Sequence, residues 1–180
     1  MDVRRVVTGH DHEGNAVFVS DELVEAVAPT LTPGTEFHLL WGADGKASFP
    51  DDGSRPRAGL YFPPIDGFRF AFFTIPPNRD AAPPPGIDIV AAQEEFRSKL
   101  PGLAEHLETE HPGMHTTATI DFGIVISGEA ILELDNNVKA TLRTGDTYVQ
   151  NGTRHRWSNK GGVPFVIAVI LIGARHSKVS

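Results

Sequence analysis

Apolar and polar residues alternate at a period of two through much of the chain, and this pattern predicts β-strands. The alternation is clearest in residues 115–159, where Gly, Asp and Asn interrupt it at the positions where strands must turn. We expect this stretch to form two antiparallel hairpins, the second beginning at Val138. Side chains two residues apart share a face of a strand, so His115 and Asp121 are expected on the same face.

Other segments of the chain carry the same signal. Strands are expected at 5–8, 16–19, 37–41, 68–75 and 164–172. The first two form a hairpin, and the last is an almost continuous β-branched run, typical of a strand covered on both faces. Residues 42–60 are rich in Gly, Asp, Ser and Pro and predict a loop that covers one end of a barrel or only connects two strands.

A helical pattern occupies residues 89–109, with an intermittent apolar stripe and an interruption at Pro101. A proline cluster at 80–86 precedes it and is expected to act as a stiff spacer. We interpret the two together, 80–112, as an insertion that packs beside the sheet.

Composition restricts the class of protein. The chain has 180 residues, 40% hydrophobic and 22% charged, which suits one globular domain spanning 1–180. We divide it into N-terminal strands and a loop (1–75), the insertion (80–112) and a core (113–175).

Charge and cysteine content exclude several functions. A formal net charge of −7 without clustered Lys and Arg argues against a nucleic-acid partner. The chain has no cysteine, so any metal must bind nitrogen and oxygen ligands. No apolar run is long enough for a signal peptide or a membrane span, so we expect a cytoplasmic protein with no membrane partner.

The central stretch resembles the cupins, whose two motifs are G(X)5HXH(X)3-4E(X)6G and G(X)5PXG(X)2H(X)3N. In the first motif His115 stands at the first histidine and Thr117 at the second. Asp121 replaces the glutamate, Gly128 closes the motif, and Thr109 takes the place of the leading glycine.

The second motif is closer to the family pattern at its end than at its beginning. Gly145 opens it, and Gly152, His155 and Asn159 keep the G(X)2H(X)3N spacing. The segment between is one residue short, with Gln150 and Asn151 where the family has proline.

This resemblance implies a mainly all-β fold. We expect a cupin-like double-stranded β-helix, or jelly-roll barrel, with an N-terminal strand extension and a short helical insertion. The resemblance also implies a homodimer that acts on a small molecule in the barrel cavity.

The candidate chemistry rests on His115, Asp121 and His155. The resemblance implies that they converge inside the barrel, where two imidazoles and a carboxylate could hold one divalent ion (Fe, Mn, Ni or Zn) and leave positions open. Thr117 removes the family's fourth ligand. The alternative is a metal-free site, in which Asp121 orients one histidine and raises its basicity.

Neighbouring residues could contact a substrate. Thr117, Gln150 and Trp157 are the candidates, since Trp157 shares a strand face with His155 and Gln150 offers an amide. Arg154 should point away from His155, because adjacent side chains on a strand alternate.

Three functions are compatible with these residues. The loss of a metal ligand beside groups able to move protons favours lyase or isomerase chemistry, a dehydration or decarboxylation next to a carbonyl. The alternatives are an iron(II)-dependent dioxygenase and a small-ligand-binding module without turnover.

Overall fold

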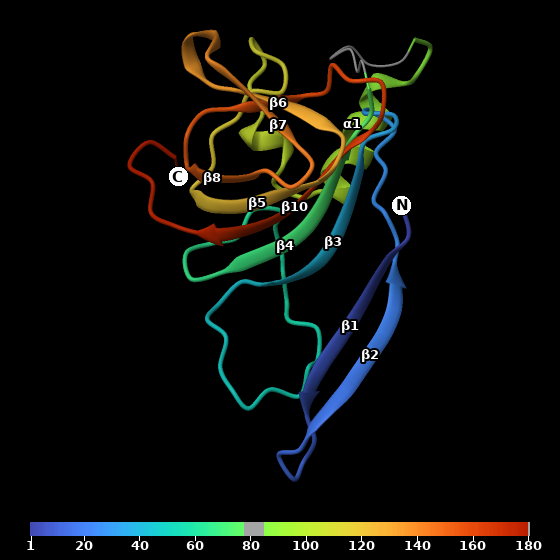
Figure 1. Ribbon diagram of the computed structural model, residues 1–180, viewed down its shortest axis with the longest axis vertical. Coiled ribbons are helices and arrows are strands. Elements are labelled where there is room, and N and C mark those ends of the chain that lie inside the picture. Colours follow the sequence, from blue (N-terminus) through green and yellow to red (C-terminus); the bar gives the residue numbers. More distant parts are fainter. Residues whose placement is uncertain (78–84, 180) are drawn as a thin grey trace.

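Strands dominate the part of the chain that the computed structural model describes, residues 1–77 and 85–179. The larger sheet has the order β3 (Glu36–Ala43), β4 (Phe68–Ile75), β10 (Phe165–Gly173), β5 (Thr119–Ser127) and β8 (Thr147–Asn151). The smaller sheet has the order β7 (Lys139–Arg143), β6 (Glu129–Glu133) and β9 (Arg156–Ser158), and every pairing is antiparallel (Figure 1).

The two sheets enclose a common core. Val125 of β5 and Phe165 and Ile167 of β10 are buried with Ala130 of β6, and Trp157 of β9 packs against this cluster. Burial of apolar area of this kind is the main force that holds two sheets together. The architecture confirms the expectation of a mainly all-β, cupin-like jelly roll.

The expected pairing within residues 115–159 is wrong in one respect. The strands β5 and β6 are neighbours in the sequence, yet β5 pairs with β8 and β10, whereas β6 pairs with β7 and β9. The chain changes sheets at Gly128, whose φ of 79° suits glycine, and a Cβ there would lie 2.6 Å from the Pro164 carbonyl oxygen. Within residues 115–159, only the β6–β7 connection is a hairpin, so neither of the two expected hairpins forms.

The strongest strand predictions are confirmed. The aromatic segment 68–75 is β4, and the β-branched run is β10, which pairs at both edges. The expected cover on both faces is wrong toward the end of β10, because Ile170 and Ile172 are 43% and 39% exposed. The N-terminal hairpin is longer than expected, with β1 spanning Val3–His10 and β2 spanning Ala16–Val24.

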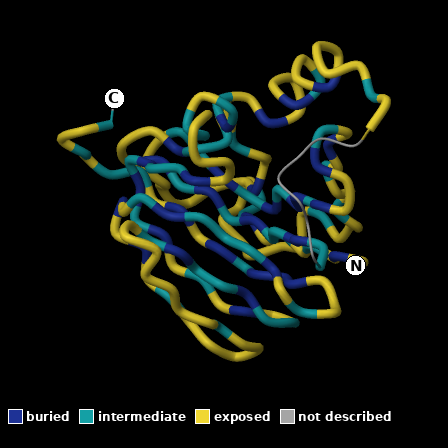
Figure 2. The backbone as a smooth tube through the Cα atoms, turned by 90° about the horizontal axis from the view of Figure 1, so that it is seen from above, coloured by how far each residue is buried: buried dark blue, intermediate teal, exposed yellow. Residues whose placement is uncertain are grey.

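The helical insertion is shorter than its sequence pattern. Helix α1 (Ile89–Lys99) begins after Asp88, whose Oδ1 accepts from the N–H groups of residues 90 and 91. Pro101 ends it, and only a 3₁₀ turn, Ala104–His106, follows. The helix packs Phe96 against Phe37, while its other side is exposed (Figure 2). The proline spacer predicted at 80–86 lies largely outside the described residues.

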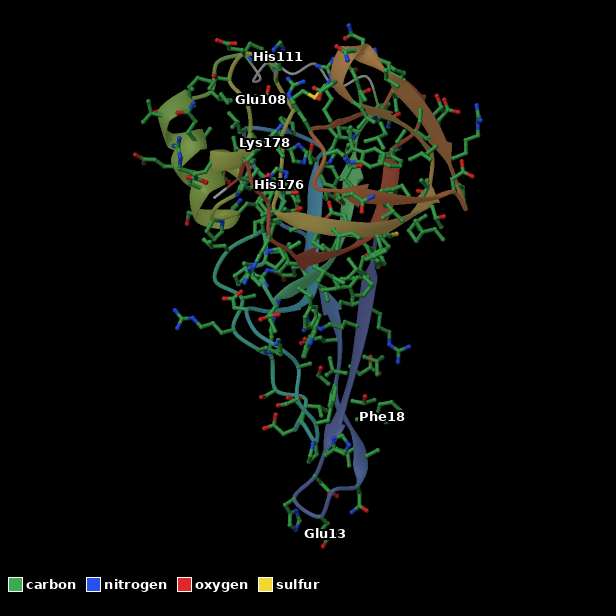
Figure 3. All side chains as sticks on the ribbon, turned by 90° about the vertical axis from the view of Figure 1, so that its left-hand side faces the viewer. Glu13, Phe18, Glu108, His111, His176 and Lys178 are labelled. Carbon is green, nitrogen blue, oxygen red and sulfur yellow. The ribbon has the colours of Figure 1, made fainter. Side chains whose placement is uncertain are left out.

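The β1–β2 hairpin projects from the barrel as an arm (Figure 1). Glu13 and Phe18 lie on it, far from the end of the barrel that carries Glu108 (Figure 3). The loop 44–67 runs beside the arm, where the His10 N–H donates to the Asp51 carbonyl (2.8 Å). It then returns to the barrel.

Within the described residues, no helix is long and apolar enough to cross a membrane.

Candidate functional site

Two of the three principal candidates, His115 and His155, lie side by side. His115 precedes β5 and His155 precedes β9, and each N–H donates to the other residue's carbonyl at 3.0 Å. This bridge brings the two imidazole rings to 4.2 Å between centroids. The bridge therefore pairs the first histidine of the first cupin-like motif with the histidine of the second motif.

Main-chain carbonyls fix the orientation of both rings. The Nδ1 of His115 lies 3.0 Å from the Gly113 carbonyl oxygen, and the Nδ1 of His155 lies 2.8 Å from that of Thr153. Because a carbonyl only accepts, each Nδ1 carries the proton, and each neutral ring has its lone pair on Nε2. The expectation that Asp121 orients an imidazole is therefore corrected, since Gly113 and Thr153 do so.

The surroundings keep both rings neutral. The pKa of His155 is lowered to about 3, mainly by burial and in smaller part by the neighbouring His115. Burial also lowers the pKa of His115. Neither ring holds a proton at neutral pH, so each offers an acceptor or ligand nitrogen.

Asp121 lies on the inner side of β5, farther along the strand from His115. It is 6% exposed, and its cross-strand neighbours are Gln150 of β8 and Leu171 of β10. Its Oδ1 is buried, and no described residue forms a hydrogen bond with it. Burial raises the pKa of Asp121 to about 6, although a hydrogen bond from Thr119 opposes the shift.

A chain of hydroxyl groups extends from Asp121 toward the histidines. Thr119 hydrogen-bonds to the Asp121 carboxyl, and its Oγ1 lies 2.8 Å from the Oγ1 of Thr117. Thr117 and Thr119 are both buried. Either hydroxyl can donate in the bond between Thr117 and Thr119, and both threonines share a strand face with Asp121.

Two tyrosines near Asp121 were not identified from the sequence. Burial, followed by the charge of Asp121, raises the pKa of both Tyr61 and Tyr148, so both remain neutral donors. The Tyr148 ring lies over Gly123, where a Cβ would come within 2.3 Å of it. Tyr148 could have been identified from the sequence, because the alternation in β8 places it on the same face as Gln150. Tyr61 could not, because it lies in a loop, where side chains follow no period.

The loop 44–67 covers the barrel at the histidine end. The Tyr61 N–H donates to the Pro101 carbonyl (2.8 Å), which ties the loop to the helical insertion. The ring of Phe62 stacks on that of His115 at 6.4 Å and meets that of His106 edge-on at 4.8 Å. The structure therefore supports a loop that covers one end of the barrel over one that only connects two strands.

The three candidate substrate residues lie in the interior or its wall. Thr117 belongs to the hydroxyl chain, and Gln150 is buried with its amide donating to the carbonyl and hydroxyl oxygens of Thr153. The Trp157 ring packs 4.9 Å from that of Tyr148 and 6.5 Å from that of His155. Contact of Thr117, Gln150 and Trp157 with a substrate remains a prediction.

The donor atoms do not complete a three-ligand metal site. Among residues 1–77 and 85–179, no three His, Asp or Glu side chains gather closely enough to hold an ion. Two imidazoles come together, Asp121 does not join them, and Thr117 stands where the family has a histidine. A metal bound by His115, Asp121 and His155 remains a prediction, and we derive no reaction step through it.

Arg154 points away from His155, as the alternation predicted, and joins three segments. Its Nε and Nη2 donate to the two carboxylate oxygens of Glu108, both at 2.6 Å, and its Nη1 donates to Asp135 at 2.7 Å. Glu108 precedes His115, and Asp135 lies in the β6–β7 turn. We call this set of three residues the Arg154 clasp.

The fold and this pair of motif histidines agree with a match to the family model described as "Cupin domain", which covers residues 104–171. The chain belongs to the cupin superfamily. The matched residues include the histidine pair, Asp121, the whole smaller sheet and, of the larger sheet, β5, β8 and most of β10.

Fungal proteins are among the relatives of this cupin. "Oryzines biosynthesis cluster protein J" of Aspergillus oryzae is 42% identical over 65 residues, 34% of this chain and 36% of that protein. "Cupin-domain-containing oxidoreductase srdB" of Neurospora crassa is 26% identical over 160 residues, 86% of this chain and 65% of that protein. The match thus spans only about a third of the first relative's length.

Among the solved structures similar to this chain is that of a predicted oxalate decarboxylase from Thermotoga maritima. It is 15% identical with a TM-score of 0.43, over 83% of this chain and 91% of that one.

Proposed function

We propose that this cupin is an enzyme that moves protons on a small organic molecule inside the barrel, in a lyase or isomerase reaction next to a carbonyl group. The observation that carries the proposal is the buried Asp121 carboxyl, whose Oδ1 has no hydrogen-bond partner among the residues that the structure describes. An unpaired buried polar atom costs about 1–3 kcal/mol, so a ligand group is a natural partner for it.

Asp121 is the residue suited to carry the proton. A general acid or base is most effective when its pKa lies near the working pH, and burial brings the pKa of this carboxyl to about 6. His155, with a pKa of about 3, instead accepts a hydrogen bond through Nε2. The pH dependence expected near neutrality therefore belongs to Asp121 and not to a histidine.

Other groups would orient the ligand. The neutral hydroxyls of Tyr61 and Tyr148 can donate to a carbonyl oxygen whose neighbouring carbon loses a proton to Asp121. Phe62 above His115 helps to exclude water from the interior.

The test is turnover by the Asp121→Asn variant on a panel of carbonyl, hydroxy-acid and phenolic compounds, followed by proton NMR. Turnover should fall about 10²- to 10⁴-fold, the usual contribution of general acid–base catalysis. Asp66→Asn serves as the control, because Asp66 forms only a surface pair with Lys46 (3.7 Å). Equal turnover by wild type and Asp121→Asn would refute the proposal; binding without turnover by either would favour a ligand-binding module.

A second candidate is a metal-dependent oxidoreductase, such as an iron(II) dioxygenase. It is favoured by the paired histidines, whose carbonyl-bound Nδ1 atoms leave two Nε2 atoms available as ligands. A relative bearing the name oxidoreductase supports it as well. A bound ion would supply Lewis-acid or redox chemistry.

Metal analysis of protein purified without added metal, with turnover measured before and after chelation, separates the two candidates. Stoichiometric metal and loss of turnover with chelator support the oxidoreductase. Turnover that is indifferent to chelator supports proton transfer by Asp121.

A further inference from the structure

A cavity of about 240 Å³ lies at the end of the larger sheet, beneath the loop 44–67. Its volume equals that of roughly eight water molecules at about 30 Å³ each. Most of the wall is apolar and comes from the loop, three strands and the helix end, namely Leu39, Trp41, Leu60, Phe70, Leu100 and Leu171. This volume is slightly below the range of about 300–1,000 Å³ typical of ligand pockets, so the cavity suits only a small organic molecule with an apolar body.

Two arginines line the cavity, and Arg69 is fully occupied. Its five N–H groups donate to the carbonyls of Leu60 (twice), Ala43 and Phe68, and to Asp44, at 2.5–2.9 Å. A guanidinium has five donors, so none remains for a ligand. Asp44 also balances its charge.

Arg55 is different. It donates through Nη2 to the Leu39 carbonyl at 3.2 Å, and no ion pair joins it to a carboxylate within the described residues. The lining of the cavity contains no Asp or Glu. Arg55 is exposed to solvent, so the cavity combines an apolar body with one positive charge at its rim that has free donors.

We propose that this cavity binds a small organic carboxylate, with its apolar body against Leu39, Leu60 and Leu171 and its carboxylate on Arg55. The planar guanidinium matches the two oxygens of a carboxylate. Ligand binding here goes beyond the proton-transfer function and stands whether or not the barrel interior is catalytic.

The cavity also borders the barrel interior. Tyr61 lines it and lies within electrostatic reach of Asp121, and Leu171 of its wall is the cross-strand neighbour of Asp121. A ligand in the cavity is separated from Asp121 by these two side chains.

The probe is phenylacetate, and phenylacetamide is its neutral counterpart of the same shape. Binding is measured by calorimetry and by the fluorescence of Trp41 in a Trp157→Phe background, since these are the chain's two tryptophans. Phenylacetate should bind, and phenylacetamide should bind at least tenfold more weakly. Arg55→Gln should weaken phenylacetate binding about ten- to a hundredfold, the loss expected for charged hydrogen bonds.

Arg57→Gln is the matched control, because it removes the same charge from the same loop but is not part of the cavity lining. It should leave the affinity for phenylacetate unchanged. Turnover by Asp121→Asn tests the catalytic proposal separately. Methyl NMR should show shifts at Leu60, Ala71 and Leu171. Absence of binding at millimolar phenylacetate, equal affinity in Arg55→Gln, or shifts confined to other methyls would overturn the inference.

Discussion

At the scale of single residues, Asp121 combines a functional advantage with a cost in stability. In the folded protein its carboxyl keeps a proton up to a pH of about 6, whereas an unfolded chain releases it near 3.9. Folded protein therefore binds more protons between these values, and stability falls as pH rises through this window.

Asp121→Asn should remove this dependence. The stability of the variant relative to wild type should rise between pH 4 and pH 8, by up to about 3 kcal/mol for a pKa shift of this size. Urea unfolding of both proteins at several pH values measures the difference. A stability difference between the two proteins that stays constant across this range would contradict the raised pKa of the buried Asp121 carboxyl.

Gly123 is the second residue with a specific requirement. Gly123→Ala would place a methyl group within 2.3 Å of the Tyr148 ring and should cost about 1–3 kcal/mol in unfolding free energy, the range for overpacking. Gly45→Ala is the control, since a Cβ there meets nothing within 4 Å. Equal stability of the two variants in urea would show that Tyr148 does not lie over Gly123.

The residues found from the sequence and those missed have a physical explanation. His115 and Asp121 were identifiable because they follow the period of a strand and stand at motif positions. Tyr61 was not, because a loop has no period and its side chain is placed by the bond to Pro101 and by packing on Phe37.

At the scale of elements, alternation predicted where strands lie but not which strands pair. The period of two specifies the faces of a strand, and both β6 and β8 offer β5 an equally suitable alternating edge. The change of sheet at Gly128 depends on a close approach to Pro164 that comes from distant sequence. For the same reason the interruption of the helix at Pro101, a local signal, was easier to predict than the hairpins, although the α-helix does not resume after it as the pattern over 89–109 predicted.

The Arg154 clasp links the elements that carry the histidine pair. Arg154→Gln should lower the unfolding free energy by about 1 kcal/mol, since the bidentate pair is partly exposed. A more specific effect is faster hydrogen exchange at the amides of His115 and His155, which bond to each other's carbonyls.

Arg143→Gln is the control for the clasp, because it removes a surface pair with Glu129 (3.0 Å) elsewhere on the smaller sheet. Its histidine amides should exchange as in wild type. Unchanged exchange in Arg154→Gln would mean that the clasp does not position the pair.

At the scale of the whole molecule, the outer face of the larger sheet carries an exposed apolar row. Phe122 of β5 pairs with Val149 of β8 and Ile170 of β10, and the three are 43%, 55% and 43% exposed. Contiguous apolar patches on a protein surface commonly mark interfaces, and a two-fold dimer would bury the same row on both subunits. We propose that this face forms the expected homodimer.

Phe122→Lys should weaken such a dimer at least a hundredfold, because it places an unpaired charge in the apolar centre of the contact. Light scattering after size exclusion over a range of concentrations measures the mass. Val138→Lys, at a 59% exposed position in the β6–β7 turn, should leave the dimer intact. A wild-type protein that is monomeric at all concentrations would contradict the proposal.

The central claim is that the barrel interior of this cupin holds a carboxyl that exchanges a proton near neutral pH. The most direct measurement is a ¹³C NMR titration of the aspartate side chains in chelator-treated protein, with Asp121→Asn used to assign the signal of Asp121. The account predicts a midpoint at a pKa of about 6 for the signal that disappears in the variant. A midpoint near the ordinary aspartate value of about 3.9 would contradict it.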